Sequence, residues 1–215
     1  MQNNLNSWDS CWEVVYQTQE WGKYPPEELV RFIARNFYKV PKRKEVKILD
    51  LGCGTGSATW YIAREGFSAY GIDGSETAIK IVKQRFQNEK LNGDFKVGDI
   101  IKLDYPDSFF DCVVDVMSLL HNRIENLKII LDEVYRVLRP NGKVFSMVFS
   151  NKCEIVKDSN QLLGKGYTHF FSKEEIVDLF SKFTNVNIET TERTDRGNFC
   201  SYYVLTAEKN DKNRK

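Results

Sequence analysis

The chain has 215 residues, of which 41% are hydrophobic and 28% are charged. This composition is typical of a globular protein with a full hydrophobic core, and the length favours one domain over several. The 31 basic and 30 acidic residues leave a formal net charge of +1. No overall basic field therefore favours nucleic acid or an anionic membrane as a partner.

Five scattered cysteines form no C-x-x-C pair, and with only two histidines in addition they supply no zinc site. The polar first ten residues lack the apolar segment of a signal peptide. No apolar run approaches the ~18 residues that a membrane span needs. We therefore expect a cytoplasmic protein with reduced thiols and no bound metal.

Aromatic side chains are concentrated near the start of residues 1–44, which we expect to form a helical cap segment. Trp8, Trp12 and Tyr16 are spaced by four, which predicts that they share one helical face. Pro26 predicts the start of a second helix over about residues 27–38.

From residue 45 to residue 208 the pattern predicts one α/β domain. Short strands are expected over residues 46–51, 68–72, 95–97, 112–117 and 143–149, with helices over residues 57–65, 75–89 and 124–138. This alternation is typical of β-α-β units, which form a parallel sheet with helices on both faces.

The last part of this domain has a different pattern. Ser172 and Glu175 have the spacing of a capping box and predict a helix to about residue 182. Strand-like runs at 186–191 and 201–207, with a polar loop between them, predict an antiparallel hairpin. Residues 209–215 are polar and are expected to form a frayed tail.

Three alternating glycines, Gly52, Gly54 and Gly56, follow the first expected strand and precede a helix. Glycine permits the tight turn and close backbone approach that a nucleoside-binding loop needs. Asp73 ends the second strand, nineteen residues after Gly54, where a carboxylate can bind both ribose hydroxyls of an adenosine. Asp99 ends the third strand, where it could meet the edge of an adenine. A helix cap is the alternative role for either aspartate.

The spacing of the glycines favours one class of adenosine compound over another. In a dinucleotide fingerprint the third glycine would stand where this chain has Ser57. Asp50 precedes the loop, and an anion there suits a ligand with a positive amino or sulfonium group rather than a pyrophosphate. A nicotinamide-dependent oxidoreductase is therefore disfavoured but stays open as the alternative enzyme.

The segment ILDLGCGTG resembles motif I of the class I S-adenosylmethionine-dependent methyltransferases. The segments YGIDGS, VGDI, FDCVVDVMSLLH and RVLRPNGKVF resemble later motifs of that family and follow in order, over about residues 46–149. The pattern is most similar to the small-molecule enzymes of methyltransferase types 11 and 25. The resemblance implies a Rossmann-like, doubly wound sheet of seven strands, mostly parallel with an antiparallel C-terminal strand, and S-adenosylmethionine as cofactor.

The resemblance also implies which residues bind the cofactor. It implies that the methionine part meets Asp50 and the loop of Gly52, Cys53, Gly54 and Gly56. The ribose would meet Asp73, with Gly74 and Ser75 beside it, and the adenine would meet Asp99 and Ile100. Asp115 and Val116 would face either the methionine or the acceptor. From the aromatic segment we add Trp21, because a sulfonium cation is attracted to aromatic faces.

His121 and His169 follow the fourth and fifth strands and are the candidate general bases, which a hydroxyl or protonated amine acceptor requires. The alternative for each is an ordinary loop residue with one hydrogen bond. After the fourth strand the chain lacks the Asn/Asp-Pro-Pro-aromatic motif of enzymes that methylate nucleic-acid bases. We therefore expect a small-molecule acceptor, methylated on O, N, C or S.

Three questions stay open at this point. The chain could be a methyltransferase-like module that binds the cofactor, or nothing, and acts through protein contacts. The N-terminal aromatic residues could form a lid over cofactor and acceptor, which we favour, or an extra helix packed on the outside. The sequence does not indicate an oligomeric state.

Overall fold

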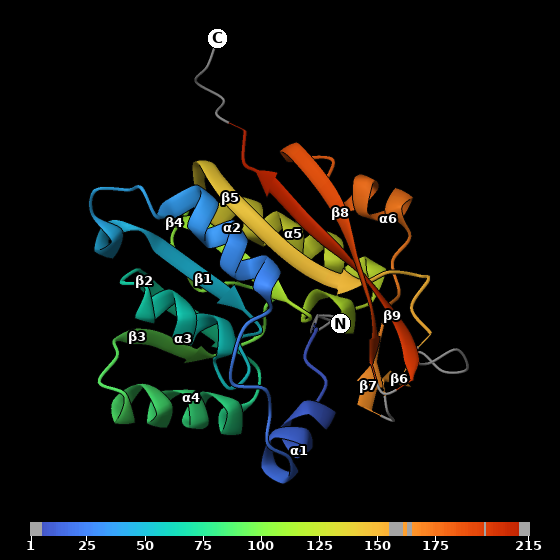
Figure 1. Ribbon diagram of the computed structural model, residues 1–215, viewed down its shortest axis with the longest axis horizontal. Coiled ribbons are helices and arrows are strands. Elements are labelled where there is room, and N and C mark those ends of the chain that lie inside the picture. The colour runs from blue at the N-terminus through green and yellow to red at the C-terminus, as the bar shows by residue number, and fades with distance from the viewer. Residues whose placement is uncertain (1–5, 155–160, 163–164, 196, 211–215) are drawn as a thin grey trace, which may run out of the picture.

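The computed structural model describes residues 6–154, 161–162, 165–195 and 197–210, and a seven-stranded sheet forms its centre (Figure 1). The strands are β1 (Lys47–Leu51), β2 (Ser68–Asp73), β3 (Gly93–Val97), β4 (Phe110–Val116), β5 (Leu138–Phe149), β8 (Thr184–Asp195) and β9 (Asn198–Glu208), with β6 (Gln161–Leu162) and β7 (Lys165–Tyr167) as a separate pair. The order in the sheet is β3-β2-β1-β4-β5-β9-β8. Strand β9 is antiparallel to both of its neighbours, and the remaining pairs are parallel. The doubly wound fold expected from the sequence is confirmed.

Helices cover both faces of this sheet. They are α1 (Cys11–Thr18), α2 (Glu27–Phe37), α3 (Ser57–Arg64), α4 (Glu76–Asn88), α5 (Ile124–Val137) and α6 (Lys173–Leu179). Figure 1 shows α2 in front of β4 and β5, and α5 behind them. Helix α1 packs against α4 and β7, near the carboxyl ends of the parallel strands.

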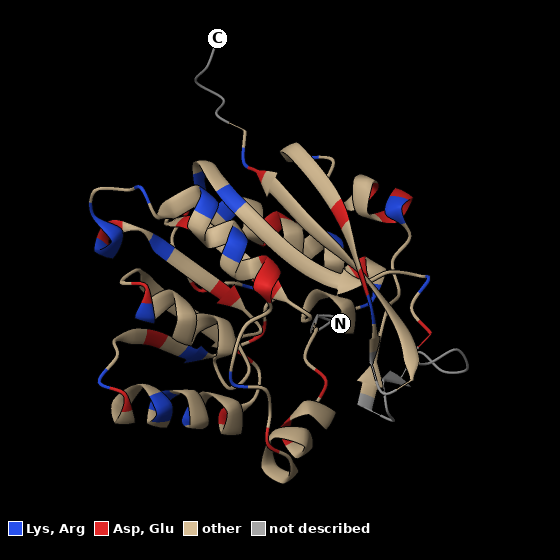
Figure 2. Cartoon of the chain, viewed as in Figure 1, with Lys and Arg blue, Asp and Glu red and all other residues tan. Residues whose placement is uncertain are grey.

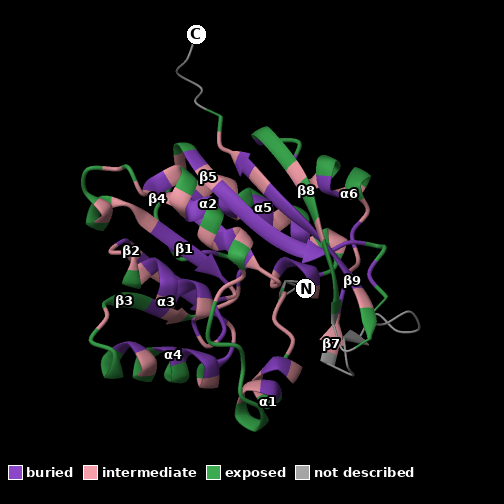
Figure 3. Cartoon of the chain, viewed as in Figure 1, coloured by how far each residue is buried: buried purple, intermediate pink, exposed green. Residues whose placement is uncertain are grey.

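The core lies between the sheet and these helices, and Figure 3 shows it as buried residues along β1, β4, β5 and β9. Phe145 of β5 is completely buried, and its ring centroid lies 5.3 Å from that of Phe32 in α2. Leu29 and Ile33 of α2 are also completely buried. Helix α2 therefore belongs to the core of the domain, although it precedes the first strand.

Replacing Leu29 by alanine tests this role of α2. We expect Leu29→Ala to lower the free energy of unfolding by ~2–5 kcal/mol, because the cavity that it leaves is filled only in part. Val14 of α1 is 58% exposed, so Val14→Ala is the matched control and should change stability by less than ~0.5 kcal/mol. Urea unfolding followed by circular dichroism measures both variants. Equal unfolding curves would contradict a core role for α2.

Strand β5 begins earlier than the sequence suggested, at Leu138 instead of Lys143. Its pairing with β4 is irregular there, because the partner changes from Leu138 at Phe110 to Lys143 at Cys112. Asn141 adopts a φ of 62° and donates its N–H to the carbonyl of residue 209 at 3.0 Å. The Pro-Asn-Gly segment is therefore a bulge within the strand and not a turn before it.

Two further boundaries differ from expectation. Residues 193–195, expected in a loop, extend β8, because the hairpin continues through the pairs Arg193–Cys200 and Thr194–Phe199. Helix α1 begins at Cys11, so Trp8 precedes it and does not share its face. The short pair β6 and β7 was not expected. Residues 211–215 of the expected tail lie outside the described residues.

Other local features agree with the sequence. Ser172 and Glu175 make both reciprocal hydrogen bonds of the capping box at the start of α6. Acidic residues stand in the first turns of α2 and α4 and basic residues follow along both helices, as Figure 2 shows by colour. None of the helices in the described part of the chain has the length and apolar character needed to cross a membrane.

Candidate functional site

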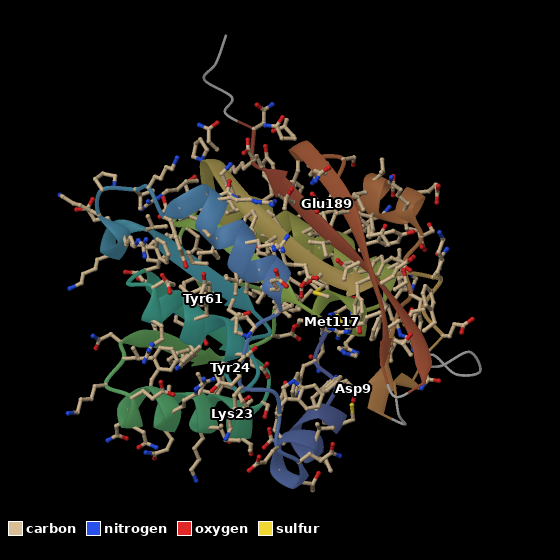
Figure 4. The ribbon with its side chains drawn as sticks, viewed as in Figure 1. Asp9, Lys23, Tyr24, Tyr61, Met117 and Glu189 are labelled. Atoms are coloured by element: carbon tan, nitrogen blue, oxygen red, sulfur yellow. The ribbon has the colours of Figure 1, made fainter. Side chains whose placement is uncertain are left out.

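A cavity of about 550 Å³ opens at the carboxyl ends of the parallel strands, and its volume is typical of small-molecule sites. Its lining includes residues on or just after strands across the whole sheet: Asp99, Asp73, Asp50, Val116, Met147, Tyr202 and Arg193, in the order of the strands from β3 to β8. Figure 4 labels three other lining residues, Met117 after β4 and Asp9 and Tyr24 on either side of α1.

The glycine loop permits close approach on two sides. Gly52 and Gly54 have φ angles of 68° and 51°, at which other residues would be strained. A β-carbon on Gly54 would lie 2.7 Å from the hydroxyl of Tyr16, which lines the cavity. A β-carbon on Gly56 would lie 2.3 Å from Val82 of α4. Gly56 therefore permits close packing against α4, and it does not line the cavity.

Asp50, at the end of β1, is only 2% exposed and lines the cavity. Its Oδ2 accepts a hydrogen bond from the Thr59 N–H at 3.2 Å. Burial raises the pKa of Asp50 to about 8, and the carboxylates of Asp115 and Asp73 add to the shift. Because a cationic partner stabilises a buried carboxylate, this position suits a ligand with an amino or sulfonium group.

Asp73 joins the glycine loop to the start of α4. Its Oδ2 accepts from the Gly54 N–H at 2.8 Å, and its Oδ1 accepts from the Ser75 N–H at 2.9 Å. Burial raises its pKa to about 6, opposed by these two hydrogen bonds. Each carboxylate oxygen accepts more than one hydrogen bond, so Asp73 keeps acceptor capacity for ligand hydroxyls.

Asp99 holds the N-terminal segment. Its carboxylate accepts hydrogen bonds from the N–H of Ser7 at 2.7 Å, the N–H of Trp8 at 3.2 Å, the Ser7 hydroxyl and the N–H of Ile101 at 3.0 Å. Both oxygens are therefore engaged by donors of the chain itself. An adenine amino group would have to displace one of them.

Two more contacts fix this segment over the cavity. Glu13 of α1 accepts hydrogen bonds from the hydroxyls of Ser75 and Thr77, each at 2.5 Å. Both donors lie at the N-terminus of α4, where the helix dipole favours a negative charge. The ring of Trp8 lies so close to Gly74 that a β-carbon there would come within 2.2 Å of it. Gly74 lines the cavity, whereas Ser75 caps α4.

Trp12, Tyr16 and Trp21 form an aromatic cluster in the same N-terminal segment. Trp21 is 40% exposed, and its ring centroid lies 5.9 Å from that of Trp12 and 6.0 Å from that of Tyr16. The Trp12 centroid lies 4.4 Å from the ring of His121. All four side chains line the cavity.

His121 lines the cavity in a defined protonation state. Its Nδ1 lies 2.9 Å from the carbonyl oxygen of Tyr167. Since a carbonyl only accepts, Nδ1 carries the hydrogen and Nε2 keeps its lone pair. Burial lowers the pKa of His121 to about 4, so the ring is neutral near pH 7.

His169 has a different environment. Its Nδ1 lies 3.2 Å from the Tyr167 hydroxyl, and its Nε2 lies 3.3 Å from a carboxylate oxygen of Glu175. Its ring packs edge-on against Phe171. It does not line the cavity, so the structure brings only one of the two candidate bases to the site.

Asp115 of β4 is buried and holds the turn that follows this strand. Its oxygens accept hydrogen bonds from the N–H groups of Ser118 and Leu119 and from the Ser146 hydroxyl, at 2.6–3.0 Å. Burial raises its pKa to about 6. Its neighbour Val116 lines the cavity, and Asp115 does not.

The cavity therefore collects most of the residues singled out from the sequence. Those that line it are Asp50, Gly52, Cys53, Gly54, Asp73, Gly74, Asp99, Ile100, Val116, Trp21 and His121. Those that do not are Gly56, Ser75, Asp115 and His169. Within the described ranges, no three His, Cys, Asp or Glu side chains are grouped to hold a metal ion.

Arg193 and Tyr202, on the far side of the cavity, are among the lining residues that were not predicted from the sequence. Arg193 was assigned to a loop, and Tyr202 to a strand with no role. The pairing of β8 with β9 sets Thr191 opposite Tyr202 and brings both missed side chains to the cavity. Only the register of this hairpin could have indicated them.

Comparison with known proteins gives a consistent result. Residues 48–142 match the family model described as a methyltransferase domain. The chain is 29% identical over 131 residues to norajmaline N-methyltransferase of Rauvolfia serpentina, an alignment that covers 59% of this chain and 43% of that enzyme. It is 27% identical over 161 residues to a demethylmenaquinone methyltransferase of Lactobacillus johnsonii, covering 72% and 62% respectively. The chain thus spans about half the length of these curated relatives.

Solved structures share the fold. A methyltransferase of Methanosarcina mazei, described as S-adenosylmethionine-dependent, superposes with a TM-score of 0.67 at 24% identity, over 78% of this chain and 93% of that chain. Phosphoethanolamine N-methyltransferase 2 of Haemonchus contortus, solved with S-adenosylhomocysteine, superposes with a TM-score of 0.72 at 15% identity, over 94% and 57% respectively.

Proposed function

We propose that the chain is an S-adenosylmethionine-dependent methyltransferase that transfers the methyl group to a small-molecule acceptor, because residues 48–142 match a methyltransferase domain and the relatives named above are methyltransferases. One observation carries the proposal: Asp50, Asp73 and Asp99, from the ends of three adjacent strands, line one cavity together with the glycine loop. The formal net charge of +1, with acidic and basic residues interspersed along the ribbon in Figure 2, supports a small molecule over a nucleic acid as acceptor.

The residues present fit this cofactor. S-adenosylmethionine supplies a methyl group already activated by a sulfonium, so the protein needs chiefly to bind, align and exclude water. Asp50 offers a buried carboxylate to the cationic part, and Asp73 offers acceptor atoms to the ribose hydroxyls. Gly52 and Gly54 let the backbone approach the ligand.

We assign the general base to His121 rather than to His169. His121 is neutral, lines the cavity and has its Nε2 lone pair available, so it can take a proton from a hydroxyl or an amine. His169 is assigned a structural role between Tyr167 and Glu175.

The N-terminal segment before Pro25 is proposed as a lid. Its hydrogen bonds to Asp99 and to the start of α4 support this role, as does the contact of Trp12 with His121. Helix α2 packs in the core, so the lid is shorter than the cap segment of residues 1–44.

We place the protein in the cytoplasm, in keeping with five cysteines that are all free.

Replacing Asp73 by alanine should weaken S-adenosylmethionine binding at least tenfold, or about 1.4 kcal/mol, because hydrogen bonds to a charged group contribute ~1.5–3 kcal/mol. Calorimetric titration measures the affinity, and circular dichroism checks the fold. Asp104 is exposed and outside the cavity lining, so Asp104→Asn is the control. Unchanged affinity in a folded Asp73→Ala variant would remove Asp73 from the site.

The function as a whole is tested by two measurements on the full chain. Calorimetry should show binding of S-adenosylmethionine and none of NADH. A screen of small metabolites should then identify an acceptor through release of S-adenosylhomocysteine. Binding without release on any acceptor would favour a non-catalytic module.

A further inference from the structure

The cavity has two halves of different charge. The half formed by β1, β2 and β3 carries the carboxylates of Asp50, Asp73 and Asp99. The half formed by β4, β5, β9 and β8 is lined mainly by apolar and aromatic groups, including Met147 and Tyr202. If the first half takes the methyl donor, as proposed above, the second half takes the acceptor.

Arg193 gives the second half a positive charge. It is the only lysine or arginine among the described residues that line the cavity. Its guanidinium carbon lies 4.8 Å from the centre of the Tyr202 ring, and its Nη2 donates a hydrogen bond to the Tyr202 hydroxyl at 3.0 Å. Its remaining N–H groups form a rigid fork that matches a carboxylate or a phosphate.

No carboxylate in the described part of the chain pairs with Arg193. By contrast, Arg136 and Arg139 each form an ion pair, at 2.8 Å with Glu133 and at 2.6 Å with Asp111. Arg193, which is exposed, therefore lines the cavity as a cation without a counter-ion among the described side chains.

The other titratable groups on this side are otherwise engaged. The Oδ1 of Asp9 accepts from the Cys11 N–H at 2.9 Å, near the start of α1. Asp115 is buried outside the cavity lining and accepts hydrogen bonds from its three donors. His121 is neutral. None of these groups neutralises Arg193.

We propose that the methyl acceptor carries an anionic oxygen group, a carboxylate or a phosphate, and that Arg193 and Tyr202 bind it. The Tyr202 oxygen accepts from Arg193. Its hydroxyl hydrogen, which otherwise meets Cys200, can rotate to donate to the same anion. The rest of the acceptor lies against the apolar and aromatic wall. Arg193 is thus a specificity-determining residue that selects the charge of the acceptor. This inference rests on the proposed function, since it assigns the other half to the methyl donor.

Binding of simple probes tests the inference without the natural acceptor. Benzoate, phenyl phosphate and the uncharged benzamide are titrated into the full chain with S-adenosylhomocysteine present. Quenching of tryptophan fluorescence reports binding, because Trp12 and Trp21 line the cavity. At least one anionic probe should bind tenfold more tightly than benzamide. Whether benzoate or phenyl phosphate binds more tightly indicates whether the site prefers a carboxylate or a phosphate.

Variants then assign the preference to Arg193. Arg193→Gln should weaken binding of the anionic probe at least tenfold and change benzamide binding less than twofold. Arg193→Lys should keep part of the preference, because it retains the charge but loses the fork. Arg35 is exposed on α2 and outside this cavity, so Arg35→Gln should behave as the wild type.

Calorimetry with S-adenosylhomocysteine on the same samples separates two failures. In the first, S-adenosylhomocysteine binds to a wild type that shows no preference for an anionic probe, or that binds no probe at all. Either result overturns the inference and leaves the proposed function standing. A preference that survives in Arg193→Gln also overturns the inference. If the wild type does not bind S-adenosylhomocysteine, the proposed function itself fails.

Discussion

Replacing His121 by glutamine should lower kcat at least a hundredfold with a hydroxyl or protonated amine acceptor, and should change S-adenosylmethionine affinity less than twofold. A positioned general base contributes roughly 10²–10⁴ to the rate. Glutamine can occupy a similar volume and bond the Tyr167 carbonyl, but it cannot take up a proton. The rate of S-adenosylhomocysteine release, with the acceptor found in the screen, measures the effect.

The pH dependence provides a second check on this base. The pKa of His121 is lowered to about 4 by burial, so the ring takes up a proton only below that pH. We expect kcat/KM to show no loss from this group between pH 8 and pH 6. A histidine with its ordinary pKa near 6.5 would lose most of its basic form over that range.

His169 provides the matched control, because it is the other histidine and does not line the cavity. His169→Gln should leave kcat within about threefold of the wild type. Full activity of the His121 variant, or an equal loss in both variants, would contradict the assignment of the base.

Three residues that the sequence assigned to one site, and that the cavity brings together, share one property. Asp50, Asp73 and Asp99 each stand at the end of a strand, and the carboxyl ends of parallel strands meet at one edge of the sheet. Local pattern and chain order are therefore enough to bring them together.

The residues that sequence analysis missed depend on contacts between distant segments. Ser7 meets Asp99 across 92 positions, and no local pattern encodes this contact. Arg193 reaches the cavity only because the hairpin of β8 and β9 has its particular register. A shift of one residue would turn Arg193 to the other face of the sheet.

Deleting residues 1–24 should lower kcat/KM at least a hundredfold and leave a core that unfolds cooperatively. The expectation follows from the contacts of the segment, which covers Asp99 at one end of the cavity and packs Trp12 on His121 at the other. Without it, water reaches the reacting groups and the acceptor loses one wall. Helix α2, which begins at Glu27, keeps its own contacts with the core.

Limited proteolysis of the full-length chain measures how accessible the same segment is to trypsin. Lys23 is exposed and is the only lysine or arginine in the first 30 residues, so trypsin cuts the lid from the core at one site. S-adenosylhomocysteine should slow this cleavage, because a lid that closes on the ligand is held in place by it. Glu13→Ala, which removes the acceptor of the Ser75 and Thr77 hydroxyls, should speed cleavage, and Val14→Ala should not.

A truncated chain with full activity, or a rate of cleavage that does not change when the ligand binds, would contradict the role of the segment as a lid. A truncated chain that does not fold would favour the alternative, in which the aromatic segment serves packing alone.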